Sequence, residues 1–195
     1  MRKVHENPGH SEWFIERFRA MAAEGVDLAG EARLVDAMAP RGARILDAGC
    51  GAGRVGGELA ARGHTVVGVD VDPVLIEAAR REFPEIEWHN VDLAEFDPGE
   101  LGITEKFNAA VCAGNVMPFL ASSTREEVLR RIGAALRPTG RAVFGFGAGR
   151  GYSFDEFLAD ARAAGLEPDL LLSTWDLRPL ADDSDFLVAV LRPVA

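Results

Sequence analysis

The 195-residue sequence contains few of the residues that most often carry chemistry. It has two lysines, two cysteines and one tyrosine, and its four histidines are His5, His10, His64 and His89. No histidine lies in the second half of the chain to act as a general base there. His10 is a weak candidate for that role, so we assign no catalytic residue. Without a histidine cluster beside the cysteines, we also expect no metal site.

Cys50 and Cys112 are the two cysteines. In a reducing compartment such a pair is expected to remain as two buried thiols. The sequence leaves open whether they approach each other.

Long apolar runs and excess positive charge are also missing. No apolar stretch reaches the roughly 18 residues of a membrane span, and the N-terminus lacks the apolar region of a signal peptide. We therefore expect a cytoplasmic protein without a membrane partner. The 21 basic and 31 acidic residues give a net charge of −10. A general nucleic-acid binder needs the opposite sign, so we expect no nucleic-acid partner. The length predicts one domain, residues 1–195, of unknown oligomeric state.

The most informative stretch is Arg-Ile-Leu-Asp-Ala-Gly-Cys-Gly-Ala-Gly-Arg, residues 44–54. A short apolar strand runs into three glycines at alternate positions, and a helical pattern follows. Glycines at such a turn permit positive φ and let a ligand approach the backbone. The helix behind them presents free N–H groups and a positive dipole end. This pattern predicts a nucleotide-type loop in an α/β domain.

Two details indicate which nucleotide is bound. If Gly49 and Gly51 were the first two glycines of a dinucleotide loop, G-x-G-x-x-G, the third glycine would fall at position 54. In this sequence the third glycine is Gly53, one position earlier. Asp47 at the strand end would repel a pyrophosphate and attract a cationic amino group. The next strand, residues 65–70, ends in Asp70, 21 residues after Gly49, close to the ~20-residue offset of a ribose-binding acid. Asp70 could instead cap the following helix, although Asp72 is better placed to do so.

These residues resemble motif I of the class I S-adenosylmethionine (SAM) methyltransferases, whose cofactor carries an amino group and a sulfonium but no phosphate. The resemblance implies an α/β, Rossmann-like, doubly wound fold with helices on both faces. Its seven-stranded sheet is mostly parallel with an antiparallel last strand. The matching region begins near Glu31, and residues 1–40 form an N-terminal helical extension that either packs on the sheet or serves as a lid.

The resemblance also implies which residues bind SAM. In it, Asp70 takes the ribose hydroxyls, Val71 packs on the adenine and Asp92 bonds the adenine amino group. Asp92 as a helix cap and Asn115 as a turn residue stay open as alternatives. The full predicted set is Asp47, Ala48, Gly49, Gly51, Gly53, Asp70, Val71, Asp92, Leu93, Gly114 and Asn115.

Substrate residues are harder to identify. Trp13, Phe14 and Phe18 occur at helical spacing within residues 10–23, where Ser11 is a plausible cap. They either pack in the interior or line a substrate pocket, and we name Trp13 and Phe14 as candidates. Tyr152 is a third candidate, with a packing or surface role as the alternative. The resemblance also places substrate residues between positions 175 and 184, where we find no motif.

The predicted function is transfer of the SAM methyl group to an unidentified, small-molecule acceptor by in-line displacement. Enzymes that methylate exocyclic amines of nucleic acids tend to carry an Asn/Asp-Pro-Pro-aromatic run after the fourth strand, and Gly114-Asn115-Val116-Met117 lacks it. The alternatives are a SAM-binding protein without catalysis, or a protein or RNA methyltransferase that needs a partner. The glycine spacing disfavours an NAD-type oxidoreductase.

Overall fold

The computed structural model describes residues 9–194, so residues 1–8 of the predicted extension lie outside the described residues. The elements of the described chain are α1 (His10–Ala23), α2 (Gly30–Met38), β1 (Arg44–Ala48), α3 (Arg54–Ala61), β2 (Thr65–Asp70), α4 (Pro73–Glu82), β3 (Glu87–Asn90), β4 (Phe107–Cys112), α5 (Val116–Phe119), the 3-10 helix η1 (Ser122–Thr124), α6 (Arg125–Ala135), β5 (Leu136–Gly147), α7 (Phe154–Ala163), β6 (Leu166–Leu172) and β7 (Phe186–Pro193).

The strands form one seven-stranded sheet in the order β3-β2-β1-β4-β5-β7-β6. Strands β1 to β5 pair in parallel, and β7 is antiparallel to both of its neighbours. The predicted fold class is therefore confirmed. The chain winds outward from β1 to β3 and then crosses back to β4, and ligands of such sheets bind where the winding reverses. Here that point is the carboxyl edge of β1 and β4.

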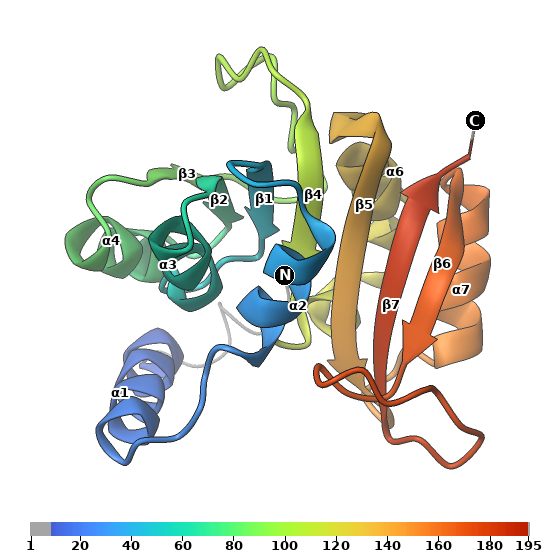
Figure 1. The fold of residues 1–195 in the computed structure, drawn as a ribbon, viewed down its shortest axis with the longest axis horizontal. Helices are drawn as coiled ribbons and strands as arrows, with labels where there is room; N and C mark the ends of the chain where they lie inside the picture. The colour runs from blue at the N-terminus through green and yellow to red at the C-terminus, as the bar shows by residue number, and fades with distance from the viewer. Residues whose placement is uncertain (1–8, 195) are drawn as a thin grey trace.

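Helices cover both faces of the sheet (Figure 1). One apolar core joins the sheet to α6 and α7, and the other joins it to α2, α3 and α4. Strands β1 and β2 are buried almost throughout, as expected of parallel strands with both faces covered. No helix within residues 9–194 combines the length and the hydrophobicity that crossing a bilayer requires.

Helix α1 lies away from the sheet, beside α3 and α4 (Figure 1). Ile15 is its one buried residue. The expected cap at Ser11 is wrong, because Gly9 is the N-cap residue and no side chain caps the helix. The Ser11 hydroxyl instead donates to Oδ2 of Asp72 at 2.5 Å. This hydrogen bond joins the start of α1 to the start of α4.

Candidate functional site

The glycine loop connects the end of β1 to the start of α3. Gly49 and Gly51 have φ angles of 79° and 55°, which residues with a side chain rarely adopt. The amide of Gly49 donates to the carbonyl of Val69 at 2.7 Å and holds the loop against β2. A Cβ on Gly49 would lie 2.5 Å from Cγ2 of Val116 in α5. Glycine at this position is therefore required both by φ and by the close approach of α5.

Asp47 lies near the end of β1 and is only 2% exposed. Its Oδ2 accepts a hydrogen bond from the amide of Gly56 at 2.8 Å, in the first turn of α3. Burial raises the pKa of the Asp47 carboxyl to about 7, the Gly56 hydrogen bond opposes this, and the nearby Asp70 adds to the increase. A cationic ligand group at this carboxyl would favour its ionised form.

Asp70 ends β2 and is 5% exposed. Its two oxygens accept hydrogen bonds from the amides of Gly51 and Asp72, each at 2.9 Å. Burial raises the pKa of this carboxyl, and the two backbone bonds lower it. Asp72, not Asp70, caps α4, because Oδ1 of Asp72 accepts from the amide of Val74 at 2.8 Å. Asp70 therefore ties the glycine loop to the turn after β2.

A cavity of about 430 Å³ opens beside these two carboxyls. The predicted site residues that line it come from β1, the glycine loop, β2, the β4–α5 connection and α1: Asp47, Gly49, Gly51, Asp70, Gly114 and Phe14. The fold thus brings together, at one edge of the sheet, residues that are up to 100 positions apart in the sequence.

Six predicted cofactor residues do not line this cavity: Ala48, Gly53, Val71, Asp92, Leu93 and Asn115. Asp92 Oδ1 accepts a hydrogen bond from the amide of Ala94 at 2.9 Å. Asn115 has a φ of 64°, and its Oδ1 accepts from the amide of Gly147 at 2.8 Å. The Asp92 bond closes a local turn, and in the described chain no helix follows it to be capped. The Asn115 side chain instead ties the β4–α5 connection to the end of β5, 32 positions away, and its positive φ is that of a turn residue.

Two of the three predicted substrate residues also lie outside the cavity lining. Trp13 is 54% exposed on α1. Tyr152 is 2% exposed, and its hydroxyl donates to Asp160 at 2.6 Å. The guanidinium carbon of Arg125 lies 3.9 Å from the centre of the Tyr152 ring. Burial raises the pKa of this phenol, and the surroundings of Tyr152 are those of a packed core residue.

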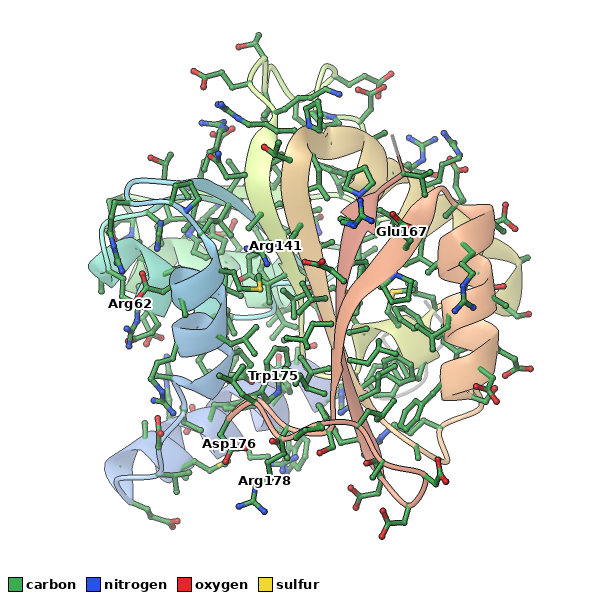
Figure 2. All side chains as sticks on the ribbon, turned by 45° about the vertical axis from the view of Figure 1, so that its right-hand side comes forward. Arg62, Arg141, Glu167, Trp175, Asp176 and Arg178 are labelled. Atoms are coloured by element: carbon green, nitrogen blue, oxygen red, sulfur yellow. The ribbon has the colours of Figure 1, made fainter. Side chains whose placement is uncertain are left out.

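The segment between β6 and β7 was the other predicted source of substrate contacts. Trp175 in this segment turns toward the sheet, whereas Arg178 points away from it (Figure 2). A Cβ on Gly145 of β5 would lie 2.2 Å from Cζ2 of Trp175. Trp175 packs directly on the sheet at this glycine and does not line the cavity.

Helix α1 contacts the loops that carry the site. A Cβ on Gly51 would lie 3.3 Å from Cε1 of the Phe14 ring. The Arg54 guanidinium carbon, at the start of α3, lies 5.0 Å from the centre of the Phe18 ring. Arg54 also forms a two-pronged ion pair with Glu31 of α2, at 2.6 and 3.0 Å, and donates to the carbonyl of Leu28. Arg54 thus joins α1, α2 and the glycine loop.

The sequence analysis missed Arg54 and Asp72 as residues of this cavity, and it considered Phe18 for a substrate pocket without naming it as a candidate. The signal for Phe18 was present, because the α1 residues that line the cavity are spaced by three and four positions: His10, Phe14, Ile15, Phe18, Arg19 and Ala22. Such residues share one helix face, to which Trp13 does not belong. Arg54 had no comparable signal, since its partners come from distant elements.

The two cysteines are separate free thiols. Cys50, in the glycine loop, lines the cavity and belongs to the core beneath α2, α3 and α4. Cys112, at the end of β4, belongs to the core on the other face of the sheet. Burial raises the pKa of both thiols, so neither is activated as a nucleophile.

The arrangement agrees with comparisons to known proteins. A family described as "Methyltransferase domain" matches residues 45–140. A TehB-like SAM-dependent methyltransferase from Corynebacterium glutamicum, known from a crystal structure, has 52% sequence identity to this chain. The two structures superpose with a TM-score of 0.90, and the match covers 96% of this chain and all of the Corynebacterium chain.

Two curated relatives match over shorter stretches. A magnesium-protoporphyrin O-methyltransferase from Rhodobacter capsulatus is 42% identical over 59 residues, which are 28% of this chain and 26% of the relative. A dTDP-3-amino-3,6-dideoxy-α-D-glucopyranose N,N-dimethyltransferase from Streptomyces fradiae is 31% identical over 121 residues, 62% of this chain and 44% of the relative. The chain thus spans less than half the length of either. Its fold and its full-length likeness to the Corynebacterium protein show that it belongs to the class I family of methyltransferases that use SAM as their methyl donor.

Proposed function

We propose that this protein transfers the methyl group of SAM to a small-molecule acceptor by in-line displacement. The observation that carries the proposal is the pair of buried carboxyls, Asp47 and Asp70, on the two sides of a glycine loop at the wall of one cavity. Both curated relatives are named for small-molecule acceptors, a porphyrin and an amino sugar. This supports a small acceptor here.

The chemistry of the donor set fits SAM. The cofactor's amino group is a cation that suits Asp47, and its ribose diol suits the acceptor oxygens of Asp70. An anionic pyrophosphate would instead face two carboxyls, which disfavours a dinucleotide. We propose the full predicted set as the SAM site, with Asp47, Gly49, Gly51, Asp70 and Gly114 at the cavity wall. The others, Ala48, Gly53, Val71, Asp92, Leu93 and Asn115, belong to the adjoining loops and strand ends.

SAM supplies an already activated methyl group, so the protein's own residues contribute position and exclusion of water. Phe14 and Phe18 cover the glycine loop from α1. We propose that the helical extension within residues 1–40 acts as a lid on a single domain, residues 1–195. Trp13 and Tyr152 remain candidates only for contacts outside the cavity. A cytoplasmic location stays a prediction from the sequence.

Calorimetric titration with SAM, S-adenosylhomocysteine and NAD⁺ tests the cofactor assignment. We expect SAM and S-adenosylhomocysteine to bind and NAD⁺ not to bind. Asp70→Ala should weaken SAM binding by roughly 1–3 kcal/mol, because the ribose loses its hydrogen-bond acceptors.

Asp97→Ala is a matched control. Asp97, like Asp70, accepts a hydrogen bond from the amide two residues ahead of it, but it lies outside the site. It should leave SAM affinity unchanged. Binding of NAD⁺ without SAM, or equal losses in the two variants, would contradict the assignment.

A further inference from the structure

We propose that the methyl acceptor is an uncharged, largely apolar molecule whose body packs beneath α1. This inference rests on the proposed function and names the substrate class of the same site. It is based on the cavity-lining side chains that were not assigned to SAM binding and on the ion pairs that surround them.

The cavity extends from the glycine loop into the space between α1, α3 and α4. Away from Asp47 and Asp70, most side chains of its wall are apolar, including Phe14, Phe18, Leu28, Leu75, Phe83 and Phe119. Phe14 and Phe18 are themselves in contact, with ring centres 4.8 Å apart. Burial of apolar ligand surface against such a wall removes that surface from water and therefore favours binding.

Among the described residues, the two arginines of the cavity wall are already paired with carboxylates. Arg54 is held by Glu31 at 2.6 Å, and Arg19 by Glu16 at 2.9 Å at the exposed rim. Within residues 9–194 the one other basic group of the wall is the His10 ring, which stacks on Trp13 with ring centres 5.7 Å apart. An anionic acceptor would have to break one of these arrangements in order to obtain a counter-ion.

The negative charges of the wall are in excess. Of the described residues, two guanidiniums and one imidazole line the cavity, against five carboxyls: Asp47, Glu58, Asp70, Asp72 and Glu82. Of the five, Glu58 is paired with Arg62 at 2.8 Å. The remaining charge favours a cationic cofactor and repels a carboxylate or phosphate on the acceptor.

This charge pattern indicates that the protein and one of its relatives have different kinds of methyl acceptor. A dTDP-sugar, the acceptor named for the Streptomyces protein, carries a diphosphate. Recognition of a diphosphate requires arginine, lysine or free backbone N–H groups. The described cavity wall offers no unpaired arginine or lysine. The amides of Gly51 and Gly56 at the glycine loop already donate to Asp70 and Asp47. We therefore infer that the acceptor here is not nucleotide-linked.

The test compares two probes of one shape, naphthol and naphthoate substituted at the same ring position. Each is titrated by fluorescence into protein saturated with S-adenosylhomocysteine, at a pH near 7. We expect naphthol to bind at least about tenfold more tightly than naphthoate. Phe18→Ala should weaken naphthol binding several-fold, and Trp13→Ala, on the exposed side of α1, should not.

A charge-insertion variant tests the electrostatic part directly. Ala22→Arg places an additional guanidinium at the cavity wall on the last turn of α1, where a basic residue is compatible with the helix. It should raise naphthoate affinity several-fold, whereas the uncharged control Ala22→Gln should not.

Equal binding of the two probes, binding of neither, or no gain in Ala22→Arg would overturn the inference. Calorimetry with S-adenosylhomocysteine is measured on the same samples. If that ligand fails to bind while naphthol still binds in the unliganded protein, the proposed function fails and the apolar character of the cavity stands.

Discussion

At the scale of single residues, the site depends on two carboxyl groups that the fold removes from water. Asp47 is held by an amide of α3, and Asp70 by amides of the glycine loop and of the turn after β2. Neither carboxyl forms an ion pair within the described chain, since its hydrogen bonds come from backbone amides. Their burial costs stability in the absence of a cation, and a cationic cofactor can recover that cost.

The raised pKa of Asp47 predicts a specific dependence on pH. The folded-state pKa of about 7 lies above the ordinary aspartate pKa of 3.8, so between these values the folded state binds more protons than the unfolded state. The carboxyl's contribution to stability therefore declines as pH rises toward 7 and is constant above it. SAM requires the ionised form, so SAM affinity should rise with pH, by up to about tenfold per unit below 7.

Calorimetry across pH 5.5 to 8 checks this prediction, with proton release measured in two buffers. Asp47→Asn retains an acceptor for the Gly56 amide but cannot ionise. The difference in pH dependence between it and the wild type isolates Asp47 from the similarly shifted Asp70. Identical profiles for the two proteins would show that Asp47 does not titrate in this range.

Gly49→Ala should destabilise the fold through two separable effects. One is the cost of positive φ for alanine, about 1 kcal/mol, and the other is the overlap with Val116, a further 1–3 kcal/mol or so. Gly102→Ala is the matched control, because Gly102 has a similar φ of 75° but nothing within 4 Å of the added Cβ.

Urea unfolding gives the free energy of unfolding of both variants. If Gly49→Ala lowers the free energy of unfolding no more than Gly102→Ala does, then α5 shifts to accommodate the added Cβ. The close contact with Val116 would then add nothing to the cost of the substitution.

At the scale of elements, α1 is the described α-helix with the fewest buried residues. Ile15 is its one buried residue, and its remaining anchors are Ser11 on Asp72, Phe14 on Gly51 and Phe18 on Arg54. All three anchors lie on the loops that form the site. A segment with so few buried contacts opens at a low free energy.

Hydrogen exchange should show α1 opening separately from the sheet. Phe18→Ala removes the contact with Arg54, worth about 0.5–1 kcal/mol, and should speed exchange in residues 10–23 several-fold without changing β1 or β4. Trp13→Ala, which changes an exposed ring on the same helix, is the control. S-adenosylhomocysteine should slow exchange of α1 in the wild type, and failure to do so would argue against a lid.

At the scale of the whole molecule, the two hydrophobic cores are joined by a common sheet. In β1, Ile45 belongs to one core and Leu46 to the other. Loss of either core would expose the same strands, so the cores cannot unfold independently.

We therefore expect residues from α2 to β7 to unfold in one transition. Scanning calorimetry should give a van't Hoff enthalpy equal to the calorimetric enthalpy. Added SAM should shift this transition upward as a unit, because it binds the folded state alone. Two resolved transitions would contradict a single domain.

The sequence by itself determined the strand, the glycine loop and the helix of residues 44–61, and its resemblance to the class I methyltransferases implied the seven-stranded sheet and the cofactor. Strand periodicity, the alternate glycines and the acids at two strand ends are local features, and backbone geometry converts them directly into a strand–loop–helix site. Five predicted cofactor residues line the cavity because parallel strands align their carboxyl ends.

The tertiary structure alone decided which face of α1 covers the site, what Tyr152 and Trp175 pack against, and how Arg54 is paired. Helical spacing marks both Trp13 and Phe14 as apolar, but only the docking of α1 brings Phe14 to the cavity wall, half-buried, and leaves Trp13 exposed. Arg54 meets Glu31 and Phe18 across 23 and 36 positions of the chain. Such contacts depend on how separate elements pack, and no local pattern encodes that packing.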